Sequence, residues 1–455
     1  MNARRVGRSM LFLFLVFAVF SLISAGQTQK PDAAYKPARA ARAAQLLLLF
    51  FLIVNFACGR NIVRNDDEFF THPAEFEPRE AVWMAARPFE SGHPTLDIVI
   101  EMVKALSPHV KIELMVADDA AQANVQKLLK ENSVDEKQIS YWTTTASPTR
   151  WYRDVGAIFL KSNKGNLKVV DFDFNCYGDC APSSAEAKKK EGIDREIAAL
   201  LKLPVIKTSL ISEGGDREVN GKGTMMAVEA VELQRNPGMT KAQVEKELLR
   251  VLGQKKMIWL KQGVAEDDRA QTGTLYANVY AAGTGGHIDE FCRFVSPDTI
   301  LLAEVSPQER DADPVMKMSY DRMEENYRIL RQAADQDGKQ FNIIRVPVAD
   351  ITYDEFVLKT ESARYFLGSK PGQTIRLLFM ASYLNFFISN GVVLAPAYWK
   401  EGRAQSTKRK DEAVMNILQK VFPARQVIQI HTEGFNYGAG GMHCATQEQP
   451  SVGFK

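Results

Sequence analysis

The chain has 455 residues, of which 45% are hydrophobic and 25% charged, and this balance excludes a disordered protein. Its formal net charge of +2 provides no field suited to a polyanion, so nucleic-acid binding is not expected. The sequence contains no zinc-finger, phosphate-loop or dinucleotide-binding motif, which argues against those classes as well.

The first sixty residues predict export from the cytoplasm. Three arginines precede an apolar run, 11–23, that ends in small residues, and this is the order of a secretory signal. A second apolar run, 46–54, is followed by Cys58 between two small residues and is similar to a lipoprotein cleavage box. The alternative is one signal peptide followed by an uncleaved membrane anchor.

These features divide the chain into two parts. Residues 1–64 are expected to form an export signal with a membrane or lipid anchor. Residues 65–455 are expected to form one catalytic domain, because no linker rich in proline, glycine or serine interrupts them. We therefore expect a protein of the cell envelope or periplasm, with a cytoplasmic protein as the alternative. The oligomeric state is left open.

From residue 66 onward, short apolar strands alternate with amphipathic helices. The pattern predicts strands at 81–84, 111–117, 156–160, 167–174 and 223–230, strand pairs within 291–305 and 383–395, and helices at 96–106, 120–129, 185–201, 240–253, 313–330 and 412–421. Two or more strands separate most helices, which is more strand than a βαβ wrap needs. An α/β ring of repeated ββαβ units fits this order, and a mixed α+β domain is the alternative.

Two helices have clear start signals. Thr240 and Gln243 form a capping box, and Gly253 ends the helix that follows. Asp313 and Pro314 provide an N-cap and a first-turn proline. The buried face of this second helix is expected to be Met316, Tyr320, Met323, Tyr327 and Leu330.

The five cysteines do not predict a disulfide scaffold. With Cys58 lipidated or removed, Cys176 and Cys180 are four residues apart in a loop, and an exported protein could bridge them. Too few further ligands lie nearby for a metal site, so neither a metal nor an organic cofactor is expected.

Cys444 is the candidate nucleophile. It follows Gly438-Ala439-Gly440-Gly441, and such a run lets backbone groups come close to a reacting centre. His287 is the candidate acid and base, and Asp289 would face the same side if both lay in a strand. The alternatives are a buried free thiol and a hydrogen-bonded structural histidine.

Asp154 follows Trp151-Tyr152-Arg153, and this aromatic lead-in predicts a partly buried carboxylate that needs a cation. A surface pair between Arg153 and Asp154 is the alternative. The segment 213–216 could line the same pocket, or could form a simple Asx-type turn.

These residue types suit hydrolysis of a guanidinium group. Two carboxylates that bind its N–H edges keep the planar cation charged and fixed. The charge favours thiolate formation and makes the carbon more electrophilic. Thiolate attack, with histidine first as acid and then as base, releases ammonia and a ureido product.

Seven motifs, in order across residues 71–450, resemble the agmatine deiminases and the bacterial peptidylarginine deiminases of the pentein superfamily. They lie in Pro73–Pro78, Trp151–Asp154, Phe174–Gly178, Gly214–Thr224, Gly286–Val295, Ser382–Phe386 and Gly441–Gln447. The resemblance implies a five-bladed α/β propeller. It also implies Cys444 as nucleophile, His287 as acid and base, and Asp154 and Asp289 as guanidinium-binding carboxylates. We further expect substrate contacts from Trp83, Trp151, Asn175, Gly215, Asp216 and Asn390.

The substrate tail remains open between agmatine, which would imply a role in putrescine and polyamine synthesis, and peptidyl arginine. Free arginine would need a cation for its carboxylate, and the candidates are Arg87, Arg153 and Arg217. Transfer of the amidino group to an amine, or a non-catalytic binding protein on the same fold, are further alternatives. Several departures from the family pattern bear on the tail. Trp83 is followed by Met84-Ala85-Ala86-Arg87-Pro88, where the family shows a second tryptophan before the proline. Thr284-Gly285 replaces an acidic pair after an insertion over Arg269–Gly283, and Cys176 replaces a common small residue.

Overall fold

The computed structural model describes residues 67–86, 94–146 and 149–453. The predicted export segments, Cys58 and Arg87 lie outside these residues. The chain divides into Met1–Asp67 and Glu68–Lys455, and all the elements below belong to the second unit. Within the described part of the chain, no helix has both the length and the apolar character needed to cross a bilayer.

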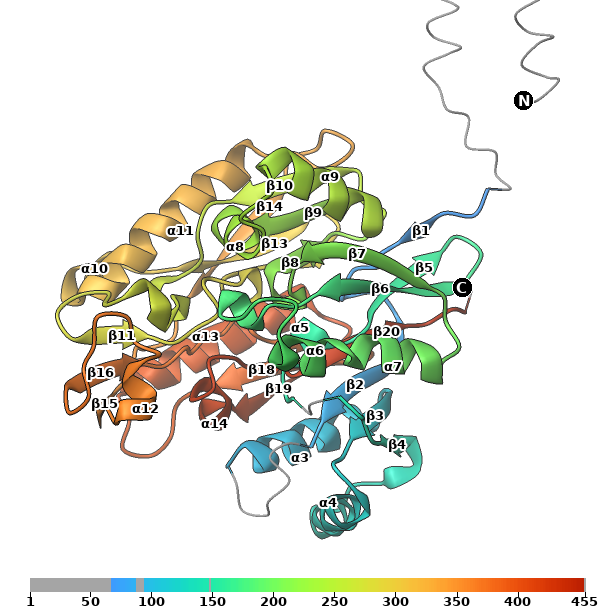
Figure 1. The fold of residues 1–455 in the computed structure, drawn as a ribbon, viewed down its shortest axis with the longest axis horizontal. Coiled ribbons are helices and arrows are strands. Elements are labelled where there is room, and N and C mark those ends of the chain that lie inside the picture. Colours follow the sequence, from blue (N-terminus) through green and yellow to red (C-terminus); the bar gives the residue numbers. More distant parts are fainter. Residues whose placement is uncertain (1–66, 87–93, 147–148, 454–455) are drawn as a thin grey trace, which may run out of the picture. The chain divides into compact units, whose positions relative to one another are not determined.

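Four sheets of the described chain repeat one topology, in which an antiparallel strand pair is followed by one or two helices and a third strand parallel to the second (Figure 1). The first contains β5 (Ile158–Ser162), β6 (Leu167–Asp173), α6 (Ala185–Glu191), α7 (Ile193–Leu200) and β7 (Val205–Ile211), with β1 (Phe70–Thr71) at its edge. The second contains β8 (Arg217–Val219), β9 (Thr224–Val228), α8 (Glu229–Arg235), α9 (Lys241–Val251) and β10 (Lys256–Leu260). The third contains β12 (Cys292–Ser296), β13 (Thr299–Glu304), α10 (Pro307–Ala312), α11 (Pro314–Gln332) and β14 (Asn342–Pro347). The fourth contains β17 (Phe387–Ile388), β18 (Val392–Ala397), α13 (Gln405–Val421) and β19 (Gln426–His431).

A fifth sheet has the same order but joins distant parts of the chain. Strand β20 (Thr446–Pro450) pairs antiparallel with β2 (Arg79–Ala85), and α3 (Pro94–Leu106) leads to the parallel strand β3 (Lys111–Met115). Helix α4 (Asp119–Glu131) and β4 (Ile139–Trp142) complete it. A further sheet holds β11 (Val279–Ala281), β15 (Tyr353–Val357) and β16 (Thr374–Leu378), beside α12 (Thr360–Ala363). The mixed α/β content agrees with the predicted fold class.

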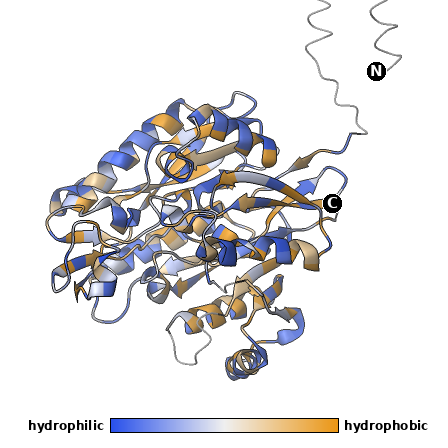
Figure 2. Cartoon of the chain, in the orientation of Figure 1, coloured by the Kyte–Doolittle hydropathy of each residue, from blue (hydrophilic) through white to orange (hydrophobic). Residues whose placement is uncertain are grey.

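Local signals explain where several helices begin and end. The capping box of Thr240 and Gln243 is present, and Asp313 accepts a hydrogen bond from the Val315 amide at 2.8 Å. On α11, Met316, Met323 and Leu330 are buried as predicted, whereas the two tyrosines are half-buried. Figure 2 shows hydrophobic residues along the strands and hydrophilic residues on the visible faces of α10 and α11.

Three predicted boundaries are wrong. The helix expected over 185–201 is interrupted at Gly192, which separates α6 from α7. The strand expected over 223–230 ends at Val228, where α8 begins. Helix α13 begins at Gln405 and not near residue 412, because its first turns are polar and carry no apolar period.

Candidate active site

The nucleophile candidate lies on the loop between α14 (Glu433–Asn436) and β20. Cys444 is 5% exposed and lines a cavity of about 280 Å³. Gly440 and Gly441, which precede Cys444 on this loop, are needed for close packing. Neither has a positive φ. A Cβ on Gly441 would lie 2.5 Å from Asn385 Oδ1, and one on Gly440 would lie 2.8 Å from the Trp151 ring.

The Asn385 side chain connects the nucleophile loop to two carboxylates. Its Nδ2 lies 3.0 Å from Cys444 Sγ, 3.3 Å from Asp289 Oδ2 and 2.9 Å from Glu290 Oε1. Its Oδ1 accepts a hydrogen bond from the His443 amide at 2.9 Å. Ligand atoms of Cys444, Asp289 and Glu290 lie within 4.8 Å of one another, a spacing that a metal ion could use, and the Asn385 amide nitrogen contacts all three residues.

His287 and Asp289 do not lie in a strand, so that prediction is wrong. Gly285 and Gly286, with φ of 108° and 102°, turn the chain into the 3₁₀ turn η7 (Ile288–Glu290). Only glycine adopts such angles without strain, and this explains the pair. The turn nevertheless brings Asp289 Oδ2 to 3.3 Å from Cys444 Sγ.

His287 is buried, and a carboxylate lies near each of its two ring nitrogens. Its Nδ1 lies 3.9 Å from Asp154 Oδ1, and its Nε2 lies 3.5 Å from Glu213 Oε2. Its backbone amide donates to Asp267 Oδ2 at 2.8 Å, which anchors the turn. Burial lowers the pKa of His287, but Asp154 and Glu213 outweigh burial and raise that pKa to about 10. The imidazole is therefore protonated at neutral pH and is ready to act as an acid.

Asp154 lies on the short helix α5 (Tyr152–Val155), and both of its carboxylate oxygens accept hydrogen bonds. Oδ1 accepts from the Gly215 amide at 2.9 Å, and Oδ2 accepts from the Tyr177 hydroxyl at 3.0 Å. The surface pair with Arg153 is not formed. Arg153 is buried and instead pairs with Glu448 at 2.6 Å and Glu75 at 3.3 Å.

The surroundings of Cys444 favour the protonated thiol over the thiolate. Burial raises the pKa of Cys444 well above its usual range, and the carboxylates of Asp289, Glu290 and Asp154 raise it further. A cation entering between these carboxylates would oppose both effects and favour the thiolate. The arrangement is therefore suited to a nucleophile that a cationic ligand activates.

The cavity brings some of the predicted site residues together and leaves others outside. Its lining consists of Trp151, Asp154, Tyr177, Asp179, Ala270, Gln271, Ala282, Gly283, Thr284, Tyr365, Phe366, Gly438, Ala439 and Cys444. Gly215 lies directly behind it, where a Cβ would come within 2.5 Å of His287 Nδ1.

Four residues expected to contact substrate are occupied elsewhere. Trp83 is buried in β2, packs edge-on against Trp142 and donates to Gln449. Asn175 caps the turn after β6, Asp216 accepts from the Val228 amide, and Asn390 bonds the backbone of residue 79. None of the four lines the cavity.

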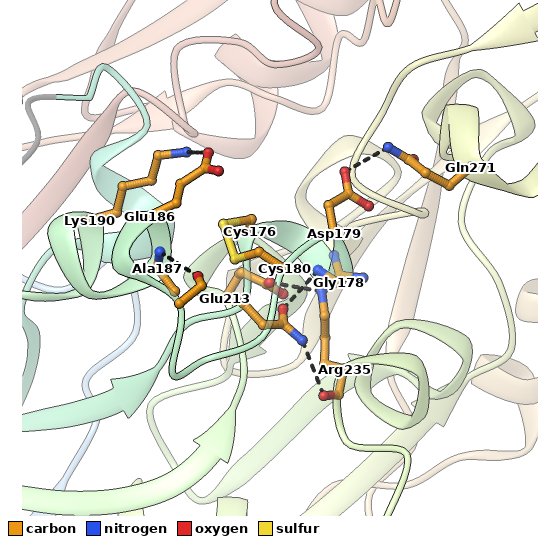
Figure 3. Close-up of a disulfide and its surroundings, with 12 residues drawn as sticks. Cys176, Gly178, Asp179, Cys180, Glu186, Ala187, Lys190, Glu213, Arg235 and Gln271 are labelled. Atoms are coloured by element: carbon orange, nitrogen blue, oxygen red, sulfur yellow. Dashed lines mark hydrogen bonds and ion pairs between the residues drawn. A yellow bond between two sulfur atoms is a disulfide. The ribbon is translucent and has the colours of Figure 1, made fainter. Parts of the chain in front are cut away.

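The Cys176–Cys180 disulfide, left open by the sequence, is formed (Figure 3). It closes a loop that supplies Tyr177 and Asp179 to the cavity wall. In Figure 3 the disulfide lies beside the buried Glu213–Arg235 pair, whose Oε1–Nε distance is 2.8 Å.

The sequence interpretation did not include Tyr177 and Asn385 among the site residues, and it placed Glu213 only in a segment that could line the pocket. All three belong to motifs that carried the family resemblance or lie next to one, and that was the available signal. Their contacts with His287 and Asp154, or with Cys444, join residues far apart in the chain.

Comparison with known proteins identifies the family. The profile of the Porphyromonas-type peptidyl-arginine deiminases matches residues 71–450. The chain belongs to this family. It is 30% identical over 408 residues to an agmatine deiminase of Medicago truncatula, covering 84% of this chain and 97% of that protein. An agmatine deiminase of Pseudomonas aeruginosa is 28% identical, with 84% and 96% covered.

Solved structures agree on the fold. A structure of the agmatine deiminase of Enterococcus faecalis superposes with a TM-score of 0.66 at 24% identity, covering 84% of this chain and 96% of that chain. The agmatine deiminase of C. jejuni superposes with a TM-score of 0.63 at 22% identity, covering 86% and 98%. The resemblance drawn from the motifs is confirmed, and this family member is a hydrolase of carbon–nitrogen bonds in linear amidines with an α/β pentein fold.

Proposed function

We propose that this family member hydrolyses the guanidine group of agmatine, giving the N-carbamoyl product and ammonia. The observation that supports this most is that the Cys444 thiol and the Asp154 carboxylate line one cavity, with the His287 imidazole and the Asp289 carboxylate beside them. Cys444 Sγ lies 3.3 Å from Asp289 Oδ2, and Asp154 lines the same cavity next to His287.

In the proposed reaction the guanidinium lies between Asp154 and Asp289, each of which accepts hydrogen bonds from its N–H edges. Its positive charge offsets the carboxylates that raise the Cys444 pKa, so the thiol gives its proton to solvent when substrate is bound. The thiolate then attacks the guanidinium carbon and forms a tetrahedral adduct.

His287 acts next as a general acid. It protonates one nitrogen, and the carbon–nitrogen bond breaks to release ammonia and leave an amidino thioether on Cys444. The neutral imidazole then takes a proton from water, whose oxygen attacks the same carbon. Collapse of this second adduct releases the ureido product and regenerates the thiol.

The cavity favours agmatine over free arginine as the substrate. The described lining residues include no lysine or arginine that could bind an α-carboxylate. Arg153 is held by two buried glutamates, and Arg217 donates to the Ser212 carbonyl and lies 4.3 Å above the Phe172 ring.

A peptidyl arginine is the second candidate, and one feature supports it. Tyr365 lines the cavity yet is 53% exposed, so it offers apolar surface that a larger substrate could contact. Turnover on agmatine, free arginine and a blocked arginine peptide, measured as ammonia release, separates the candidates. Agmatine should give the highest kcat/KM, and a higher value for the peptide would overturn this choice.

Cys444→Ala is the negative control for all three substrates. This variant should release no ammonia, and its thermal unfolding should show the cooperative transition of a folded protein. Cys292 is also buried but lies in β12 outside the cavity, so Cys292→Ala is the matched variant that should retain activity. Ammonia release by Cys444→Ala would refute the thiol mechanism.

We further propose a domain organisation and a location for this protein. Residues 1–64 would export or anchor the protein in the cell envelope, and residues 65–455 would form the catalytic domain. The repeated topology of the sheets supports a five-bladed propeller, with the catalytic loops near its axis. Fractionation of cells that express the full chain tests the location.

A further inference from the structure

The loop Asn175–Cys180 is closed by a disulfide and forms one wall of the cavity (Figure 3). It connects β6 to α6. Its middle residue, Tyr177, points its hydroxyl at Asp154, and Asp179 lies at the cavity next to Gln271. The loop therefore connects the disulfide, through Tyr177, to a carboxylate of the active site.

The backbone of this loop is unusual. Cys176, Tyr177 and Gly178 are three successive residues with left-handed angles, at φ of 54°, 59° and 88°. Residues with a side chain adopt this region at a cost, and two in succession persist only where other contacts hold them. Other contacts must therefore hold this backbone in place, and the Cys176–Cys180 disulfide is one of them.

Hydrogen bonds hold both sides of the loop, because the Asp179 amide donates to the Cys176 carbonyl at 3.1 Å and the Asp179 carboxylate accepts from Arg269 and Gln271. The Gly178 amide donates to Asn175 Oδ1 at 2.8 Å, and the Cys180 amide donates to the Asn175 carbonyl at 3.0 Å. The disulfide adds a covalent link between Cys176 and Cys180 across Tyr177. Since Cys180 is only half-buried, a small reductant can reach the bond.

Tyr177 connects the disulfide loop to the active site. The Tyr177 hydroxyl and the Gly215 amide each hold one oxygen of Asp154, at 3.0 and 2.9 Å, so together they fix the plane of that carboxylate. A guanidinium bound edge-on needs that plane to match its own. Loss of the tyrosine contact frees one oxygen and leaves the carboxylate able to rotate.

We infer that the Cys176–Cys180 disulfide positions Asp154 through Tyr177, so that reduction of the disulfide weakens guanidinium binding. The inference rests on the proposed guanidinium-binding role of Asp154. Reduction requires a dithiol: the sulfur–sulfur bond breaks, two thiols form, and the dithiol supplies two electrons and two protons as it becomes its own disulfide. Tyr177 is a positioning residue in this scheme, and so is the crosslink.

The test compares the oxidised protein, the protein treated with dithiothreitol, and the double variant Cys176→Ser/Cys180→Ser. For agmatine, reduction and the double substitution should each raise KM about tenfold, equivalent to about 1.4 kcal/mol, with a smaller change in kcat. Dithiothreitol should leave the double variant unchanged. Cys292→Ala, which retains the disulfide, should keep the full response to reduction.

Tyr177→Phe tests the route of the effect. It should raise KM about as much as reduction does, and combining it with the double substitution should raise KM no further, because both remove the same contact. Additive effects would overturn the route through Tyr177. A lower melting temperature with unchanged KM would show that the disulfide is only structural, and would overturn the inference.

A failure of the proposed function is distinguishable from a failure of this inference. If the oxidised protein releases no ammonia from any guanidine compound, the function is wrong. The inference is then decided by hydrogen exchange at the Gly215 amide, which donates a hydrogen bond to Asp154 Oδ1. Faster exchange in the reduced protein supports it, and equal exchange in the two states overturns it.

Discussion

Gly215→Ala should disable the active site with little loss of stability. The Cβ of alanine would lie 2.5 Å from His287 Nδ1, 3.0 Å from Asp154 Oδ1 and 3.3 Å from Asp289 Oδ2. His287 must retreat by roughly 0.9 Å to reach ordinary contact, and a displacement of about 1 Å in a catalytic group costs about a hundredfold in rate. This corresponds to about 2.7 kcal/mol of transition-state stabilisation.

Steady-state ammonia release measures the effect, with kcat expected to fall about a hundredfold. Overpacking of this kind costs about 1–3 kcal/mol of folding stability, so the melting temperature should fall by only a few degrees. The matched control is Gly192→Ala, because a Cβ there lies no closer than 3.8 Å to any other group and the backbone φ is −73°. Undiminished turnover by Gly215→Ala would refute the geometry derived for the three side chains.

Three other predictions concern charge around the thiol and the imidazole. Glu213→Gln should lower the His287 pKa from about 10, because the mutation removes one of the groups that raise it, so the basic limb of the kcat–pH profile should move to lower pH. An unmoved limb would exclude His287 as the acid. The folded-state pKa of His287 lies above the ordinary value of 6.5, so the protonated imidazole stabilises the fold. This contribution is complete below about pH 6.5 and is lost as the pH rises through 10. Urea unfolding across that pH range measures it. Asn385→Asp should place a further negative charge 3.0 Å from Cys444 Sγ and move alkylation of this thiol by iodoacetamide to higher pH; an identical pH profile would contradict the reasoning.

The sequence predicted the parts of the fold that depend on local signals. Thr240 and Asp313 cap helices where their spacing indicates, because a cap involves only the next two or three residues. The nature of the segment around His287 could not be predicted in this way. Two glycines before a polar residue are compatible with a strand entrance, and their positive φ appears only in the folded chain.

The active-site environment was predicted less completely than its central groups. Trp83 was assigned to the substrate because of the family resemblance, yet its side chain is fully buried in β2, packs against Trp142 and donates to Gln449. Asn385 and Glu213 act through contacts with residues 59 and 74 positions away, and periodicity carries no information at that distance.

The pairing of β20 with β2 has a consequence for biosynthesis. The sheet that begins at Arg79 is completed only by Thr446–Pro450, the segment that directly follows Cys444. The ribosome therefore synthesises nearly the whole polypeptide before Cys444 can take its position in the active site. Nascent chains should remain inert during translation, and shortening the chain before Pro450 should remove catalysis together with the pairing of β20 with β2.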